Sequence, residues 1–266
     1  MYCRSYERRN TIKRKFTRFP KKYVQCDIQK EYGVSRKFYI TYILIDRYCT
    51  IENYSWITIR KILSYYGLKT TKNRPKAFYE VLDVLEFMIN NKMITITQEL
   101  DYLSYDTGIE IEVIPNNFYS QQKWLSAYAG DFDVIMVDES TVNKDVLLLS
   151  YLYINSYINT RQTAKEIESP EQYPQAFYKT LSSMAQDISM SQMSIDKCLK
   201  ELVRKGLLIK ETVGSIKHND HPPKNVPNIY VLNKEGYQQE IKWALQKLKE
   251  IYKVKHFEKP KGKTNT

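Results

Sequence analysis

The chain has 266 residues, 42% hydrophobic and 27% charged, which is the composition of a folded protein and excludes a disordered one. This length gives room for about two domains. The formal net charge is +11, with +9 in residues 1–37, +6 in residues 241–266 and about −4 between them. Two basic ends favour a polyanionic partner. The alternative is that they only keep the protein soluble.

The cysteines and the apolar runs indicate the compartment. The four cysteines form no Cys-x-x-Cys pair, so no disulfide framework is expected. The N-terminus lacks the apolar core of a signal peptide. The most apolar run, 146–158, is too short and too polar at Ser150, Asn155 and Ser156 to span a bilayer. We therefore expect a cytoplasmic protein without membrane contact.

Residues 1–22 are predicted to form a basic arm. Phe16 and Phe19 interleave with its cations, a pattern that suits a clamp on the DNA backbone or in the minor groove. The predicted phosphate contacts in the arm are Arg8, Arg9, Lys13, Arg14, Lys15 and Arg18.

Residues 23–130 are predicted to form a first domain. The alternation of Val24, Cys26 and Ile28 indicates a short strand, and the apolar run 38–45 indicates a buried helix. The later elements are predicted in the order helix 57–66, helix 77–90, strand 93–96 and strand 109–114.

The connector before helix 77–90 is basic, and Lys72, Arg74 and Lys76 are its candidates for phosphate contacts. Acidic and aromatic side chains lie along the helix itself. The first domain is therefore predicted to contact either phosphate alone or another protein.

Residues 131–235 are predicted to form a second domain. It begins with a short alternating strand, Phe132/Val134/Met136, and a helix from Val146 that is buried on most of its circumference. Ser191 is placed to cap a helix, and Gly206 is placed to end it in a left-handed conformation. The elements after the first helix are predicted in the order helix 181–188, turn 189–191, helix 192–205, strand 207–210, loop 212–227 and strand 228–232.

These residues resemble the winged helix-turn-helix superfamily. Residues 188–195 are similar to its turn, and residues 199–208 to its recognition helix running into the first wing strand. The whole set occurs in order over roughly 90 residues. The resemblance implies a mainly α fold with small β wings (α+β), whose second helix enters the major groove of DNA.

The N-terminal half repeats this plan. The run 38–45 parallels 146–153 at an offset of 108 positions, and the two short alternating segments share that offset. Val81 and Ile195 stand 114 apart because the connectors differ in length. We therefore predict two tandem winged helices. The alternative is one winged helix after an unrelated helical domain.

The helix 192–205 combines an apolar stripe with a polar, cationic front, as a helix lying in the major groove requires. Gln192 can pair with adenine, and early residues of such helices usually reach base edges. The alternative is that these charges only solvate a protein-binding winged helix. The predicted base contacts are Gln192, Met193, Ser194, Asp196 and Lys197, and the predicted phosphate contacts are Lys200, Arg204, Lys205, Lys210, Lys217, His218 and Lys224.

Residues 236–266 are predicted to form an amphipathic helix and a basic tail. Tyr237, Ile241, Ala244 and Leu248 mark its apolar face. This face is predicted to pack against its own domain, with homodimerisation through the helix as the alternative.

No catalytic residue, metal or cofactor is predicted. The apolar strand ending in Asp138 and Glu139 is typical of nucleotide hydrolases, but no phosphate-cradling loop accompanies it. His218, Asp220 and His221 lack a fourth metal ligand. We therefore expect the chain to act by binding.

Tandem winged helices with basic ends resemble plasmid and phage replication initiators that bind repeated origin sites. This analogy rests on architecture alone. The expected partners are double-stranded DNA and the replication machinery. The alternatives are a transcriptional repressor of a mobile element and an accessory protein of partition, conjugation or packaging.

Overall fold

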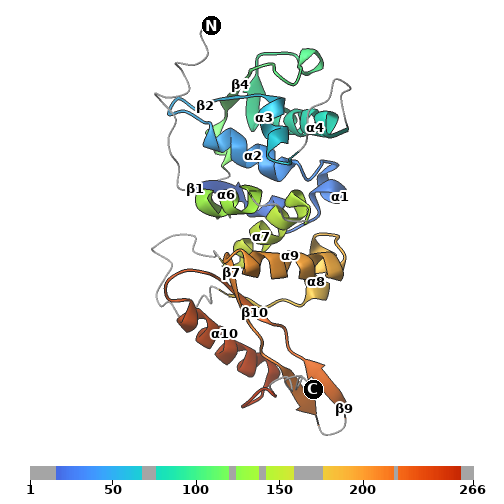
Figure 1. The fold of residues 1–266 in the computed structure, drawn as a ribbon, viewed down its shortest axis with the longest axis vertical. Coiled ribbons are helices and arrows are strands. Elements are labelled where there is room, and N and C mark those ends of the chain that lie inside the picture. Colours follow the sequence, from blue (N-terminus) through green and yellow to red (C-terminus); the bar gives the residue numbers. More distant parts are fainter. Residues whose placement is uncertain are drawn as a thin grey trace. The chain divides into compact units, whose positions relative to one another are not determined.

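A computed structural model describes residues 16–67, 76–119, 124–137, 142–158, 176–218 and 221–258. The chain divides into two compact units, residues 1–153 (unit 1) and 154–266 (unit 2). Helices and small antiparallel sheets are mixed in both units (Figure 1), so the predicted α+β class is confirmed. None of the described helices is long and apolar enough to cross a lipid bilayer.

Unit 1 contains a two-stranded antiparallel ribbon of β1 (Phe16–Pro20) and β5 (Trp124–Tyr128). Arg18, at the centre of β1, lies opposite Ser126, at the centre of β5. These two residues are 108 positions apart, the offset at which the sequence repeats. Because an antiparallel pair is symmetric about the axis between opposing residues, the ribbon itself has a local two-fold axis between Arg18 and Ser126.

The two strands predicted at 24–28 and 132–136 are wrong, because the first segment is a turn that leads into a helix and the second lies within a helix. The α1 helix (Ile28–Tyr32) begins at Asp27, whose side chain accepts a hydrogen bond from the backbone N–H of Gln29. The second segment lies in α6 (Ala129–Val137), which buries Phe132, Ile135 and Met136. Positions i and i+4 share a helix face as well as a strand face, so a short alternation does not distinguish the two structures.

A buried helix follows in each repeat, as predicted. They are α2 (Phe38–Arg47) and α7 (Lys144–Ile158), and the boundary between the units falls within α7. The tyrosines of α2 pack with bonded hydroxyls. The Tyr39 Oη donates to the Tyr23 carbonyl at 2.9 Å. The Tyr42 Oη lies within hydrogen-bond distance of two carbonyl oxygens, that of Phe118 and, at 3.0 Å, that of Arg18 in the ribbon.

Each unit has a three-stranded antiparallel sheet with the same strand order. The last strand along the chain lies in the centre, between the first and the second. The short first strands, β2 and β6, were not predicted. In unit 1 the sheet is β2 (Tyr54–Ile57), β4 (Ile109–Val113), β3 (Ile94–Ile96); in unit 2 it is β6 (Ala176–Phe177), β10 (Ile229–Leu232), β7 (Leu208–Glu211).

Each sheet is accompanied by a helix pair. The first helix starts after a capping threonine in both units: Thr58 and Thr180 accept from the backbone N–H three residues ahead. The turn after it has a left-handed residue, Gly67 (φ 68°) in unit 1 and Ser189 (φ 46°) in unit 2. The pairs are α3 (Ile59–Ser64) with α4 (Lys76–Asn90), and α8 (Leu181–Asp187) with α9 (Gln192–Arg204).

The connector predicted as a loop over 212–227 contains a hairpin instead. Its strands are β8 (Ser215–His218) and β9 (His221–Asn225). The hairpin is stabilised by burial of Ile216 and Val226 against the C-terminal helix α10 (Tyr237–Tyr252). The remaining short elements are the 3-10 helices η1 (Lys21–Tyr23) and η2 (Leu100–Tyr102) and the helix α5 (Pro115–Phe118).

The apolar face of α10 packs against its own unit, as predicted. Ala244 and Leu248 lie in one core cluster with Ile229 and Val231 of β10. Since these side chains are already buried, the face gives no support to the alternative of homodimerisation through it.

Candidate nucleic-acid interface

The α9 helix is anchored at its start and along its back. The Ser191 Oγ accepts a hydrogen bond from the Ser194 backbone N–H at 3.1 Å, as the sequence predicted. The predicted apolar stripe of Ile195, Cys198, Leu199 and Leu202 is buried throughout. A capped helix with a fully buried back presents its front in one fixed orientation.

The front of α9 begins with its predicted base-contacting residues. Gln192 and Lys197 are exposed, and Met193 is 70% exposed, whereas Ser194 and Asp196 are half-buried. Backbone N–H groups of the first turn add a partial positive charge that favours phosphate nearby. The first two turns of α9 thus combine exposed hydrogen-bonding groups with positive potential.

Ion pairs within α9 change the expected roles of its later cations. The Lys200 Nζ lies 2.6 Å from the Asp196 carboxylate, and the Arg204 guanidinium binds both carboxylate oxygens of Glu201. By contrast, no acidic side chain within 4 Å of the Lys197 ammonium occurs among the described residues. We therefore regard Lys197 as the better-placed phosphate ligand.

Lys205 does not lie on the exposed front that the sequence analysis assigned to it. Its side chain is only 3% exposed, and its ammonium lies 3.9 Å from Glu201. The reason is its position: α9 ends at Arg204, and Lys205 is the C-terminal cap residue, so its side chain folds back over the last turn. In this conformation Lys205 cannot contact a phosphate.

The strands of unit 2 also carry cations. Lys210 of β7 and Lys224 of β9 are exposed. Lys217 and His218 lie on β8, but their side chains are outside the described part of the chain.

Most of the cations predicted in the N-terminal half also fall outside the described residues, namely Arg8, Arg9, Lys13, Arg14, Lys15, Lys72 and Arg74. Two are described. Arg18 is exposed on β1, with its guanidinium 5.1 Å from the centre of the Trp124 ring. Lys76 is the first residue of α4, and its ammonium lies 3.8 Å from Glu80.

The corresponding surfaces of unit 1 are acidic. Asp83 and Glu86 are exposed on α4. Residues 93–122, which include β3, β4 and the segment between them, contain five Asp or Glu and no Lys or Arg. The acids of α4 were expected from the sequence, whereas those of residues 93–122 were not. A charge count over the residues between paired strands would have found them.

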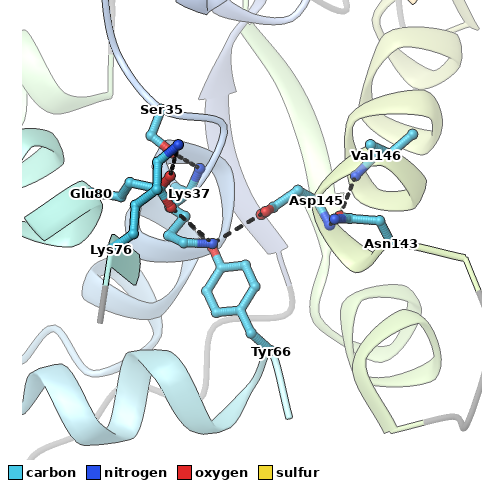
Figure 2. Close-up of polar contacts among 8 residues, drawn as sticks. All are labelled: Ser35, Lys37, Tyr66, Lys76, Glu80, Asn143, Asp145 and Val146. Carbon is cyan, nitrogen blue, oxygen red and sulfur yellow. Dashed lines mark hydrogen bonds and ion pairs between the residues drawn. The ribbon is translucent and has the colours of Figure 1, made fainter. Parts of the chain in front are cut away.

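A buried ion cluster positions α4 in unit 1, and the sequence analysis missed it as well. The Lys37 ammonium lies 3.5 Å from Glu80 of α4 and 3.5 Å from Asp145 of α7, and 4.1 Å from the centre of the Tyr66 ring. Figure 2 shows Lys37 between the two carboxylates. Burial raises the pKa of the Asp145 carboxyl, and the Lys37 ammonium opposes that shift.

No group of side chains suited to hold a metal ion occurs among the described residues. No protein-family model matches the chain, and no curated protein matches it in sequence.

Proposed function

We propose that both units are winged helices and that the chain is a sequence-specific double-stranded-DNA-binding protein that acts without catalysis. The observation that carries the proposal is α9. It is a capped helix with a fully buried back, exposed Gln192 and Lys197 at its front, and the exposed Lys210 on β7, the strand that contacts it. Such a helix suits the width and the phosphate walls of the major groove.

The two units suit different tasks. Unit 2 combines the cationic α9 front with exposed lysines on its wing, whereas α4 and the wing of unit 1 are acidic. Phosphate repels an acidic surface, so we assign base reading to unit 2.

This asymmetry favours an initiator at repeated origin sites. A symmetric dimer of helix-turn-helix proteins reads a palindrome with two equal helices. A single chain with one reading helix and an unlike second copy reads a site without such symmetry. Repeated in one direction, such sites form the arrays of replication origins. A cytoplasmic plasmid or phage initiator is therefore our favoured assignment, and the free thiols of Cys26, Cys49 and Cys198 suit that compartment.

The decisive experiment is to select bound duplexes from a random library with the purified protein, and then to map bound DNA in the native host. A consensus that recurs as direct repeats at one origin would support initiation. Scattered promoter sites would support a repressor instead. Recovery of no consensus would overturn sequence-specific binding.

Two substitutions on α9 should distinguish a base contact from a phosphate contact. We expect Gln192→Ala to cost about 1–3 kcal/mol of binding free energy on the selected duplex and much less on a scrambled one, because Gln192 is placed to reach a base edge. Lys197→Ala should weaken both duplexes alike and reduce the salt slope by about one. Fluorescence anisotropy titrations at two salt concentrations measure both effects. If Gln192→Ala lost the same binding free energy on both duplexes, Gln192 would make no base-specific contact.

The affinity itself should depend steeply on salt. If the wing, α9 and the basic arm neutralise roughly six to ten phosphates, binding should weaken by about 10³–10⁵ between 50 and 200 mM salt, because condensed counterions are released. The slope of log Kd against log salt gives the number of phosphates directly. A slope near zero would contradict a phosphate-dominated interface.

A further inference from the structure

The outer face of the sheet in unit 1 is exposed, acidic and aromatic. Its members, which we call the acidic sheet face, are Tyr54, Trp56, Thr95, Glu110 and Glu112. They lie on one side of the sheet because Tyr54 is opposite Glu112, Trp56 opposite Glu110 and Thr95 opposite Glu112 in the strand register. Tyr54 is 43% exposed and Trp56 is 48% exposed.

The tryptophan of this face is held by its neighbours. A Cβ atom at Gly108 would lie 2.7 Å from the Trp56 Nε1, so the indole rests directly on the glycine backbone. The Thr95 hydroxyl donates to the Glu112 carboxylate at 2.9 Å. An exposed aromatic ring fixed beside carboxylates suits a cationic partner, which the ring face and the negative charges attract together.

The second unit shows what covers the same face of an equivalent sheet. There the outward positions are apolar, among them Ile209, Ile229 and Val231, and α10 packs on them. In unit 1 those positions carry Thr95, Glu110 and Glu112, and no described helix takes the place of α10. The chemistry of the face in unit 1 therefore calls for a charged partner in place of an apolar helix.

The chain itself carries a complementary surface. Lys242 and Lys249 lie seven residues apart on α10, on the side away from its apolar face, and Lys253 follows as the C-cap residue of the helix; we call these three the lysine stripe. No acidic side chain within 4 Å of these ammonium groups occurs in the described part of the chain. The nearby Lys247 differs, because Glu250 holds it at 3.2 Å.

We propose that the acidic sheet face of one molecule binds the lysine stripe of the next molecule, head to tail, on adjacent DNA sites. This inference rests on the proposed function, because direct repeats place neighbouring molecules in the same orientation. Molecules in the same orientation must touch through two different surfaces. An acidic and a basic surface on one chain meet that requirement, and a contact of this kind couples the binding of neighbours.

The test uses duplexes with one or two copies of the selected site, the two copies being in direct repeat at spacings of whole helical turns. We expect the wild-type protein to bind the second site more tightly by a factor of roughly 5–150, the usual range of coupling between sites. Glu110→Lys with Glu112→Lys, or Lys242→Glu with Lys249→Glu, should bring that factor to about one and leave single-site affinity unchanged. All four substitutions in one chain should restore the coupling, because each neighbour then meets the opposite charge.

Controls lie on α1, where Glu31→Lys and Lys30→Glu each reverse one charge in the same sense at an exposed position. Neither control should change the coupling. Circular dichroism and thermal unfolding check each variant. If a charge-reversal variant fails to fold, the variant with Glu→Gln or Lys→Gln at the same two positions replaces it.

The outcomes separate the contact from the DNA-binding proposal. Single-site binding without coupling at any spacing, or coupling that survives both charge reversals, would overturn the contact. Loss of single-site affinity on reversing the lysine stripe would assign that stripe to DNA phosphate instead. If no duplex is selected, the DNA-binding proposal is contradicted. Sedimentation velocity at 50 mM salt then still tests the contact between molecules. Self-association that both reversals abolish and the fourfold variant restores would support it, and its absence would overturn it.

Discussion

Replacing Lys37 by Met should lower the free energy of unfolding by about 3–5 kcal/mol, because the buried Asp145 carboxylate would remain without the cation that pairs with it. The side chains of Lys37 and Asp145 are 10% and 11% exposed, so water screens little of the loss. Urea unfolding followed by circular dichroism measures the change. The matched control is Lys76→Met, since Lys76 also pairs with Glu80 but is 90% exposed, and it should cost no more than about 0.5 kcal/mol.

The loss in free energy of unfolding caused by Lys37→Met should become smaller as the pH falls. Burial already raises the pKa of Asp145 above its ordinary value, so the folded protein holds that proton more readily than the unfolded chain. Stability therefore falls as the pH rises through the window between the unfolded and the raised folded pKa. Removing Lys37 raises the folded pKa further, which widens this window. The difference between variant and wild type should be smaller at pH 5 than at pH 7, and adding Asp145→Asn should recover part of the loss at pH 7. A loss independent of pH would mean that packing, and not charge, is what Lys37 supplies.

Leu199→Ala should destabilise unit 2 by about 2–5 kcal/mol. Leu199 is 1% exposed on the buried stripe of α9, so truncation loses its burial and leaves a cavity. Thermal and urea unfolding of the full chain measure the change, and DNA affinity should fall with it because the helix loses its anchor.

The neighbouring substitution Lys200→Ala serves as the control for Leu199→Ala. Lys200 is exposed, and among the described residues it pairs with Asp196 one turn earlier, so its removal should change stability by no more than about 0.5 kcal/mol. Equal effects of the two substitutions would contradict the orientation of α9, and the exposed positions proposed to read DNA would move with it.

The proposed division of labour between the units has a physical basis in their charge. The same strand order supports a cationic surface in unit 2 and an acidic one in unit 1. Because phosphate attracts one surface and repels the other, two similar frameworks in a single chain can serve a nucleic acid and a protein partner.

The sequence alone determined the elements whose signals are local. The capping Ser191, the apolar stripe from Ile195 to Leu202 and the left-handed Gly206 predicted α9 to within one residue. The buried helix α7 followed in the same way from its apolar run. Caps, helical periodicity and stop signals act within a few residues, so they can be recognised without knowing which distant segments pack against the helix.

Only the tertiary structure decided the features that depend on distant partners. The β1–β5 ribbon joins segments 108 positions apart, and the short β2 and β6 exist as strands because β4 and β10 pair with them. Nothing in the sequence distinguishes Lys205 and Lys37 from lysines exposed on the surface. Their burial depends on where Glu201, Glu80 and Asp145 lie in space. The sequence indicated which helix we propose to read DNA, and only the fold showed which of its cations are paired with acidic side chains, because a charge is neutralised by its neighbours in space and not by its neighbours in sequence.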